Sequence, residues 1–131
     1  MAIYIDEELK LQFYNVFNAI SLICFHCSLD HEFCKMKYDS EGNPVGHYER
    51  NKGELIALMH SELSECLEAI RQMPIPQDKH IPAYSSEVVE LADAIIRIMD
   101  YSAAHNLPLA SAIIAKILFN DTRPIKHGKE F

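Results

Sequence analysis

Apolar residues recur near the start of the chain at the alternating three- and four-residue spacing of a helix. They occupy positions 9, 13, 16, 20, 23, 27 and 34. The pattern predicts a helix from Asp6 to about Cys34, with a break near Ser28–Asp30 because an unbroken helix of that length is long for a small domain. Residues 11–29 carry no charge but too many polar groups for a membrane span, so we expect a buried helix in a soluble fold.

Turn and proline signals divide the rest of the chain into an insertion and three more helices. Gly42-Asn43-Pro44 predicts a small hairpin or an ordered loop near residues 36–50. The helices are expected over residues 52–72, 85–105 and 108–123. Together these elements predict one all-α domain over residues 1–131, a four-helix bundle.

The charge is acidic overall and unevenly distributed. The 131 residues have a formal net charge of −7, and residues 54–100 hold nine acids against three bases. Residues 101–131 reverse the sign, with two acids and four bases. An acidic chain lacks the basic surface that sequence-independent nucleic-acid binding needs. Since no targeting segment is visible either, we expect a cytoplasmic protein with no nucleic-acid or membrane partner.

Glu62 stands in the middle of an apolar face of the helix expected over residues 52–72. On a helical wheel apolar side chains flank it on both sides, and Glu65 lies about 60° away at the edge of that face. Burying an unpaired carboxylate costs several kcal/mol, so such a group needs a proton, a cation or a metal ion. An ion pair with Arg71 or Arg97 would satisfy it without any function, as would a rotated helix that leaves it in water.

The following helix repeats the same acidic spacing. Glu62-x-x-Glu65 and Glu90-x-x-Asp93 each put two carboxylates one turn apart on neighbouring helices. A charged face is also what any surface helix shows, so the second pair alone is weak evidence. Facing one another, the two pairs would offer the oxygen ligands that suit Mg²⁺ or Mn²⁺. A di-iron centre is disfavoured, because no histidine follows a glutamate by three positions.

The last helix carries the opposite charge. Lys116, Asn120 and Arg123 share one of its faces, and Lys126 follows them. A set of this kind suits the binding of phosphate oxygens, with Arg able to bond two of them at once. Cations near the end of a helix also have a bland explanation, because they interact favourably with the helix dipole.

With these segments in order, the sequence resembles the all-α nucleoside triphosphate pyrophosphohydrolases of the MazG-like superfamily. That family is marked by E-x-x-E, a variable spacer and E-x-x-D, which here are Glu62-Leu-Ser-Glu65, 24 intervening residues and Glu90-Leu-Ala-Asp93. The ending from Lys116 to Lys129 is similar as well, so the resemblance covers about residues 52–129. This chain departs from some members in having no tryptophan, so stacking on a base would use Tyr or Phe.

The resemblance implies a MazG-like bundle that cleaves a (deoxy)nucleoside triphosphate between its α and β phosphates, giving a monophosphate and pyrophosphate. The implied ligands of Mg²⁺, or of Mn²⁺ as a substitute, are Glu62, Glu65, Glu90 and Asp93. The implied contacts to the triphosphate are Lys116, Asn120 and Arg123. Glu65, at the edge of the apolar face, or Glu62 would take a proton from the attacking water. Candidates for further substrate contacts are Arg97, Lys126, Tyr38 and Tyr48, the two tyrosines lying in the hairpin region.

The resemblance also implies a homodimer or a dimer of dimers with sites near the subunit interfaces. An apolar arc wider than one small bundle needs is consistent with such an assembly, and it comprises Ile95, Ile96, Ile98 and Met99.

The cysteines suggest a zinc site at first glance. Cys24-x-x-Cys27 is followed by His31 and Cys34, but on one continuous helix positions 24 and 34 are about 15 Å apart, too far to share one ion. A break in the helix would allow the site. Buried core thiols are the favoured interpretation, because free Cys is among the most buried residue types.

Two other classes of function remain open on the sequence. A helical nucleotide-binding or regulatory module would keep the fold without turnover, although all four acidic positions are intact. A bundle metalloprotein with redox chemistry would contain iron or show colour.

Overall fold

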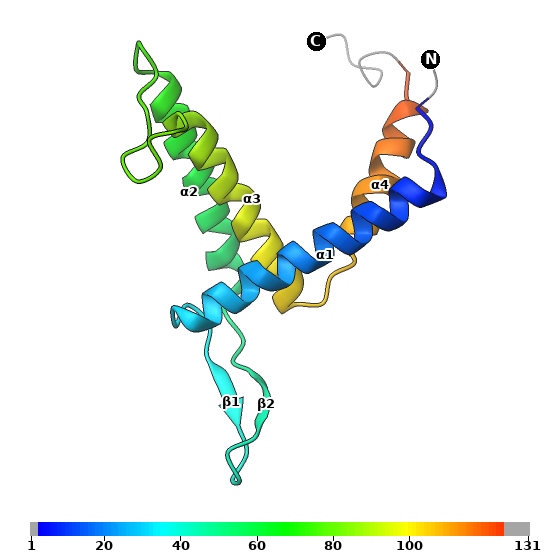
Figure 1. The fold of residues 1–131 in the computed structure, drawn as a ribbon, viewed down its shortest axis with the longest axis vertical. Coiled ribbons are helices and arrows are strands. Elements are labelled where there is room, and N and C mark those ends of the chain that lie inside the picture. The colour runs from blue at the N-terminus through cyan, green and yellow to red at the C-terminus, as the bar shows by residue number, and fades with distance from the viewer. Residues whose placement is uncertain (1–2, 125–131) are drawn as a thin grey trace.

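The computed structural model describes residues 3–124, which form four helices and one hairpin (Figure 1). In chain order the elements are α1 (Glu7–Asp30), β1 (Met36–Tyr38), β2 (Pro44–His47), α2 (Lys52–Ile70), α3 (Ser86–Ala104) and α4 (Leu109–Asp121). The predicted all-α class and the four helices are therefore confirmed. Of the hairpin or ordered loop expected near residues 36–50, the structure has the hairpin, with antiparallel strands. The boundaries of the last three helices lie within two residues of the expected ones.

The first three helices begin at side chains that cap their free amide groups. Asp6, Asn51 and Ser85 each accept a hydrogen bond from the backbone N–H three residues later, at 2.7, 3.1 and 3.5 Å. α1 ends at Asp30, inside the predicted break, and Glu32 then adopts a left-handed backbone with φ 61°. These caps mark where the three helices begin, and the left-handed residue follows the end of α1.

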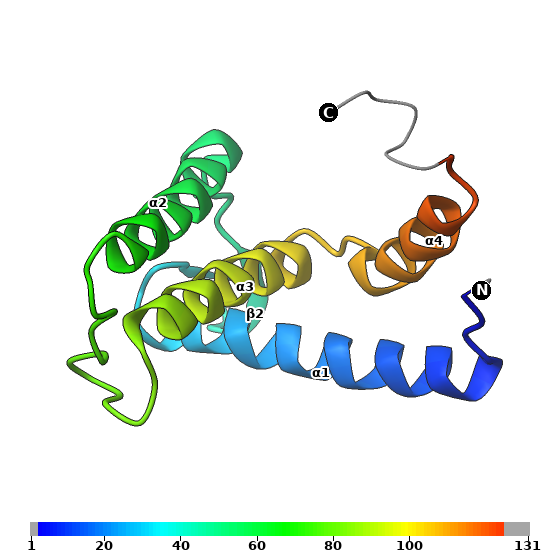
Figure 2. The same ribbon diagram turned by 90° about the horizontal axis from the view of Figure 1, so that it is seen from above.

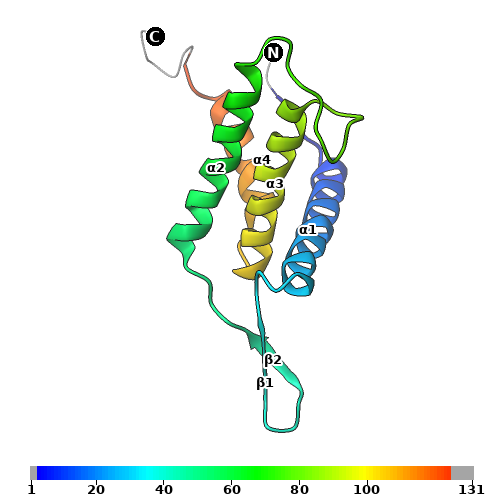
Figure 3. The same ribbon diagram turned by 90° about the vertical axis from the view of Figure 1, so that its left-hand side faces the viewer.

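α3 is the central helix, and both α1 and α2 pack on it (Figures 2 and 3). After the Asn106-Leu107-Pro108 turn, α4 runs at a bend of 118° to α3 and packs along the N-terminal half of α1 (Figure 2). The backbone N–H of Ile3 donates to Asp121 Oδ2 at 2.9 Å, which ties the end of α4 to the start of the described chain. Because the turn directs α4 away from α2, the four helices do not enclose one common core, unlike the bundle expected from the sequence.

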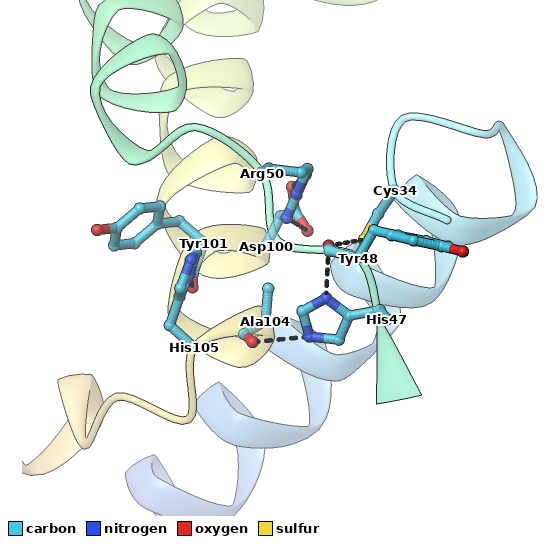
Figure 4. A network of polar contacts seen from close by, with 8 residues as sticks. All are labelled: Cys34, His47, Tyr48, Arg50, Asp100, Tyr101, Ala104 and His105. Atoms are coloured by element: carbon cyan, nitrogen blue, oxygen red, sulfur yellow. Dashed lines mark hydrogen bonds and ion pairs between the residues drawn. The ribbon is translucent and has the colours of Figure 1, made fainter. Parts of the chain in front are cut away.

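The hairpin is attached to the C-terminal end of α3 by polar contacts (Figure 4). Arg50 donates two hydrogen bonds to the Asp100 carboxylate, at 2.8 and 3.0 Å, and both side chains are nearly buried. The ring of His47 lies between two carbonyl oxygens, with Nδ1 3.0 Å from Tyr48 O and Nε2 3.0 Å from Ala104 O. The base of the hairpin is therefore fixed on α3, while its strands project away from the helices (Figure 1).

The apolar core of one chain is small in volume. Its buried apolar residues are Cys24, Cys34, Ala69, Ala94, Ala104, Ala110 and Ile114. Small side chains allow helices to approach closely, but each removes little apolar surface from water. Most of the larger apolar side chains of the helices stay at least partly exposed.

α1 exposes an apolar row that we call the α1 stripe, formed by Leu9, Val16, Ile20 and Ile23. These side chains are between 43% and 66% exposed, and they form one row because they fall within about 60° of arc on the helix. α1 packs on the rest of the chain through a different face, roughly 90° away, where Ser21 and Cys24 are buried. The expectation that the apolar positions of α1 are buried is therefore wrong for a single chain.

α3 exposes a second apolar row at alternating three- and four-residue spacing, comprising Val88, Leu91, Ile95 and Ile98. Of the wide apolar arc predicted for this helix, Ile95, Ile96 and Ile98 are exposed, whereas Met99 is half-buried. Spacing of this kind is typical of helices that pack lengthwise against another helix.

The chain has more surface than a compact protein of its size. Its accessible surface is 10002 Å², whereas a compact monomer of 15.0 kDa exposes about 7,000 Å². Even if residues 1–2 and 125–131 were as exposed as an unfolded chain, they would account for about 1,500 Å². The described residues thus leave roughly 1,500 Å² exposed that a compact monomer would bury. None of the helices within residues 3–124 is by itself long and apolar enough to span a membrane.

Candidate functional site

Three of the four predicted metal ligands meet where α2 packs on α3. One carboxylate oxygen from each of Glu62, Glu65 and Glu90 lies within 4.8 Å of the other two. Glu62 is buried, Glu90 is half-buried and Glu65 is exposed. The first acidic pair therefore meets Glu90 of the second pair across the helix contact, whereas Asp93, the fourth predicted ligand, lies outside this set.

Asp93 stands one turn after Glu90 and is half-buried on the same side of α3. Its pKa is raised by burial and by the negative charge of Glu62, and the positive charge of Arg97 offsets this in part. Burial, followed by the charges of Glu65 and Glu62, also raises the pKa of Glu90. The four carboxylates thus form one group of mutually repelling charges.

Arg97 is the cation within this group. Its Nε–H donates to Glu62 Oε1 at 2.5 Å. Arg71, the other candidate partner of Glu62, instead bonds Glu68 at 2.8 Å on the surface of α2. The buried carboxylate is therefore satisfied by an ion pair, which is one of the alternatives that the sequence leaves open.

A cavity of about 520 Å³ lies beside the acidic group, between α1, α2 and α3. Along α3 it extends from Asp93 past Arg97 to Asp100, two helical turns or about 10 Å. Its apolar wall includes Cys24, Leu55, Leu58 and Ile96. Cavities of 300–1,000 Å³ with mixed walls of this kind are typical of small-molecule sites.

The predicted phosphate-binding residues lie elsewhere in the same chain. Lys116 and Asn120 line a groove on α4, and Arg123 is exposed just after that helix. Lys116 Nζ lies 4.8 Å from the centre of the Phe119 ring. Because α4 packs along the N-terminal half of α1, a single chain does not bring this set to the acidic group. Lys126 lies outside the described residues.

The hairpin tyrosines also stay away from the cavity. Tyr38 is 63% exposed and Tyr48 is 57% exposed, and neither lines the cavity. Lys37 Nζ lies 5.1 Å above the Tyr48 ring. The residues that flank the hairpin, Phe33 and Arg50, line the cavity instead.

One acidic residue near the site, Asp78, is not indicated by the motifs of the sequence. Asp78, in the connector before α3, adds a fifth negative charge that raises the pKa of both Glu90 and Asp93. Its Oδ1 accepts from the backbone N–H groups of His80 and Ile81, at 2.8 and 2.7 Å, which lowers its own pKa. An Asp in a Pro-rich connector is a recognisable turn signal, but nothing local indicates which helices the turn approaches.

The cysteines are distributed as thiols of the core and of the cavity wall. Cys24 and Cys34 are buried, and Cys34 Sγ lies 3.8 Å from Tyr48 O. Cys27 is exposed at the cavity. Within residues 3–124, the side chains that lie close enough together to share a metal ion are those of Glu62, Glu65 and Glu90. This set contains no Cys or His.

Comparison with family models, curated proteins and solved structures gave no match to this chain.

Removing one charge from the acidic group should stabilise the metal-free protein at neutral pH. A raised pKa means that the charged form of Glu90 is less favourable in the folded chain, so stability falls as pH rises from the ordinary Glu range through that pKa. We expect Glu90→Gln in EDTA to raise the free energy of unfolding by roughly 0.5 kcal/mol near pH 7.5, a small gain because the group is partly hydrated. Below about pH 4 the Glu90 side chain is neutral, like the Gln that replaces it, so the gain in stability should vanish.

Urea denaturation at the two pH values measures this effect. Glu41→Gln, in the exposed turn of the hairpin, is the matched control and should change stability at neither pH. A loss of stability in Glu90→Gln near pH 7.5 would contradict the repulsion.

Proposed function

We propose that the protein is an Mg²⁺-dependent nucleoside triphosphate pyrophosphohydrolase of the MazG-like type. It would hydrolyse a (deoxy)nucleoside triphosphate between the α and β phosphates. The observation that carries this proposal is the meeting of Glu62, Glu65 and Glu90 from two helices beside a cavity of about 520 Å³. The ordered acidic motifs that resemble that family supply the same residues independently.

The donor set fits a hard divalent cation. Every side chain in it is a carboxylate, the ligand type that Mg²⁺ and Mn²⁺ prefer. Three ligand oxygens within 4.8 Å of one another are close enough to share an ion. Burial and, after it, the repulsion of neighbouring carboxylates raise the pKa of Glu90 and Asp93, and a bound cation would relieve that repulsion. When bound, Mg²⁺ would neutralise the phosphates and polarise the phosphorus under attack.

The chain's own groups would bind and orient the rest of the substrate. The phosphates would lie at the acidic end of the cavity next to Arg97, and the nucleoside would extend towards Asp100 along the apolar wall. Glu65 is exposed, so water reaches it, and we assign to it the removal of the proton from the attacking water. Glu62, already bonded to Arg97, is the alternative base.

The uncovered apolar surface supports a homodimer through the α1 stripe. Obligate dimers bury 2,000–5,000 Å² in total, about half of it on each partner. The roughly 1,500 Å² that the described residues expose in excess of a compact monomer is of that size. The exposed row on α3 would remain for a second contact, as in a dimer of dimers.

An antiparallel pairing of two α1 helices would also complete the site. In one chain α4 lies along the N-terminal half of α1, whereas the cavity lies at the C-terminal half, where Cys24 and Cys27 line it. A twofold axis reverses the second α1, so the partner's α4 would run beside this cavity. The basic set on α4 would then reach the triphosphate from the second copy.

The first test is the chemistry itself. With Mg²⁺ and a panel of standard and modified triphosphates, we expect monophosphate and pyrophosphate as the products. Glu62→Gln and Glu65→Gln should each lower turnover at least about 100-fold, because each removes a proposed metal ligand. Glu68→Gln, an exposed residue of the same helix, should leave turnover unchanged.

Circular dichroism checks that these variants keep their helices. Diphosphate and phosphate as products, or full activity in Glu65→Gln, would contradict the proposal. Nucleotide binding without turnover by the unaltered protein would instead identify a binding module.

The second test is the assembly. Ile20→Glu places a charge in the middle of the α1 stripe, so the protein should become a monomer at micromolar concentration. Leu22→Glu is the matched control, because Leu22 is 51% exposed but lies about 160° away from Ile20 around the helix. Analytical ultracentrifugation reads out the mass. A dimer that persists in Ile20→Glu would exclude the α1 stripe as the interface.

The third test asks whether one site takes residues from two chains. Glu65→Gln and the double variant Lys116→Ala/Arg123→Ala should each be inactive alone. Random mixing of the two should restore about a quarter of the activity, because half of the dimers then contain one intact site. A mixture of Glu62→Gln and Glu65→Gln should restore nothing, since both changes affect the same half of the site. No recovery in the first mixture would contradict a shared site.

A further inference from the structure

Arg97 bonds a residue that the proposed metal also needs. Its Nε–H donates to Glu62 Oε1 at 2.5 Å, and Arg97, Glu62 and Asp93 all line the same cavity. Arg97 acts on two of the four carboxylates, because it bonds Glu62 and its positive charge lowers the pKa of Asp93. With four carboxylates and one guanidinium, the acidic group keeps an excess of negative charge after the ion pair is counted.

We propose that Arg97 is a displaceable counterion, a step that rests on the proposed function. In the metal-free protein it holds the Glu62 carboxylate. A divalent cation competes with it for that carboxylate, and the guanidinium that is released binds the phosphates of the substrate. Metal occupancy and phosphate binding would in this way be coupled through one side chain.

The chain contains a fixed ion pair with which Arg97 can be compared. Arg50 bonds Asp100 through both terminal nitrogens, and its side chain is 13% exposed. Arg97 bonds Glu62 through Nε alone, and its side chain is 40% exposed. Glu62 is as well buried as Asp100, with 9% of its side chain exposed against 11%, so the two pairs differ in their arginines. A guanidinium that makes two bonds and is shielded from water is held more firmly than one that makes a single bond and that water reaches. The Arg97 pair is therefore the one that a divalent cation can open.

The released guanidinium would be in place for the substrate. Arg97 leaves α3 one turn after Asp93 and lines the cavity between the acidic group and Asp100. The guanidinium of Arg can donate to two phosphate oxygens at once. The bond to Glu62 uses only its Nε–H, so its terminal N–H groups remain for a phosphate. Because coupling between ligands is reciprocal, a cation that frees Arg97 strengthens phosphate binding, and bound phosphate strengthens cation binding.

Metal binding without nucleotide provides the decisive test. Mn²⁺ is titrated into the unaltered protein, Arg97→Gln and Arg97→Lys near pH 7.5, and the free ion is followed by electron paramagnetic resonance. Removing the competing charge should tighten Mn²⁺ binding about tenfold in Arg97→Gln, while Arg97→Lys should stay near the unaltered protein. Equal or weaker Mn²⁺ binding in a folded Arg97→Gln would overturn the proposal.

Inorganic tripolyphosphate, which has no nucleobase, tests whether the released Arg97 binds phosphate. In the presence of saturating Mn²⁺, Arg97→Gln should bind tripolyphosphate about tenfold more weakly, so the variant's two affinities should change in opposite directions. A purely structural role for Arg97 predicts that both affinities fall together, and that result would overturn the proposal.

A measurement on the unaltered protein covers the case in which Arg97→Gln does not fold. The Arg97 Nε–H resonance should shift and exchange faster with water when Mg²⁺ is added, while the Arg50 resonance stays unchanged. An unmoved Arg97 resonance at saturating Mg²⁺ would overturn the proposal. Opposite changes in the two affinities without any triphosphate hydrolysis would reject the proposed function alone, and hydrolysis with unchanged Mn²⁺ binding in Arg97→Gln would reject the counterion role alone.

Discussion

A carboxylate placed inside a helix contact must be neutralised, and the α2–α3 contact is built around that requirement. Glu62 lies in the middle of an apolar face, where it is buried by α3. Arg97 satisfies it with a single bond, and three further carboxylates stand close by without comparable relief. The contact therefore forms but retains unfavourable repulsion between its carboxylates. Such repulsion is more typical of sites that bind ligands than of structural cores.

The second constraint is the shortage of buried apolar surface. α1 uses small residues such as Ser21 and Cys24 to pack within its own chain and leaves its larger apolar side chains in solvent. α4 adds to this shortage, because it covers α1 and not the helices that carry the acidic group. In the proposed dimer a second copy would answer both problems together, because it would cover the α1 stripe and bring a basic helix to the acidic cavity.

The local features of the fold are predictable from the sequence, and the long-range ones are not. Capping by Asp6, Asn51 and Ser85 and the break at Asp30 follow from residue chemistry over a few positions. The meeting of Glu62 with Glu90 follows too, because helical spacing fixes each face. The Arg50–Asp100 pair joins positions that no local pattern relates. Helical periodicity marked the α1 stripe as apolar, but periodicity does not say whether the covering surface belongs to the same chain.

The turn between α3 and α4 would have a consequence for communication within the proposed dimer. Asn106 adopts a left-handed backbone with φ 50°, a conformation that Asn tolerates better than most residues. This single residue helps to set the direction in which α4 leaves α3. If α4 serves the neighbouring subunit, the shape of a turn in one copy tunes the affinity of the other copy's pocket. Evolution could then adjust that pocket by substitutions in the turn, without altering any residue that touches the ligand.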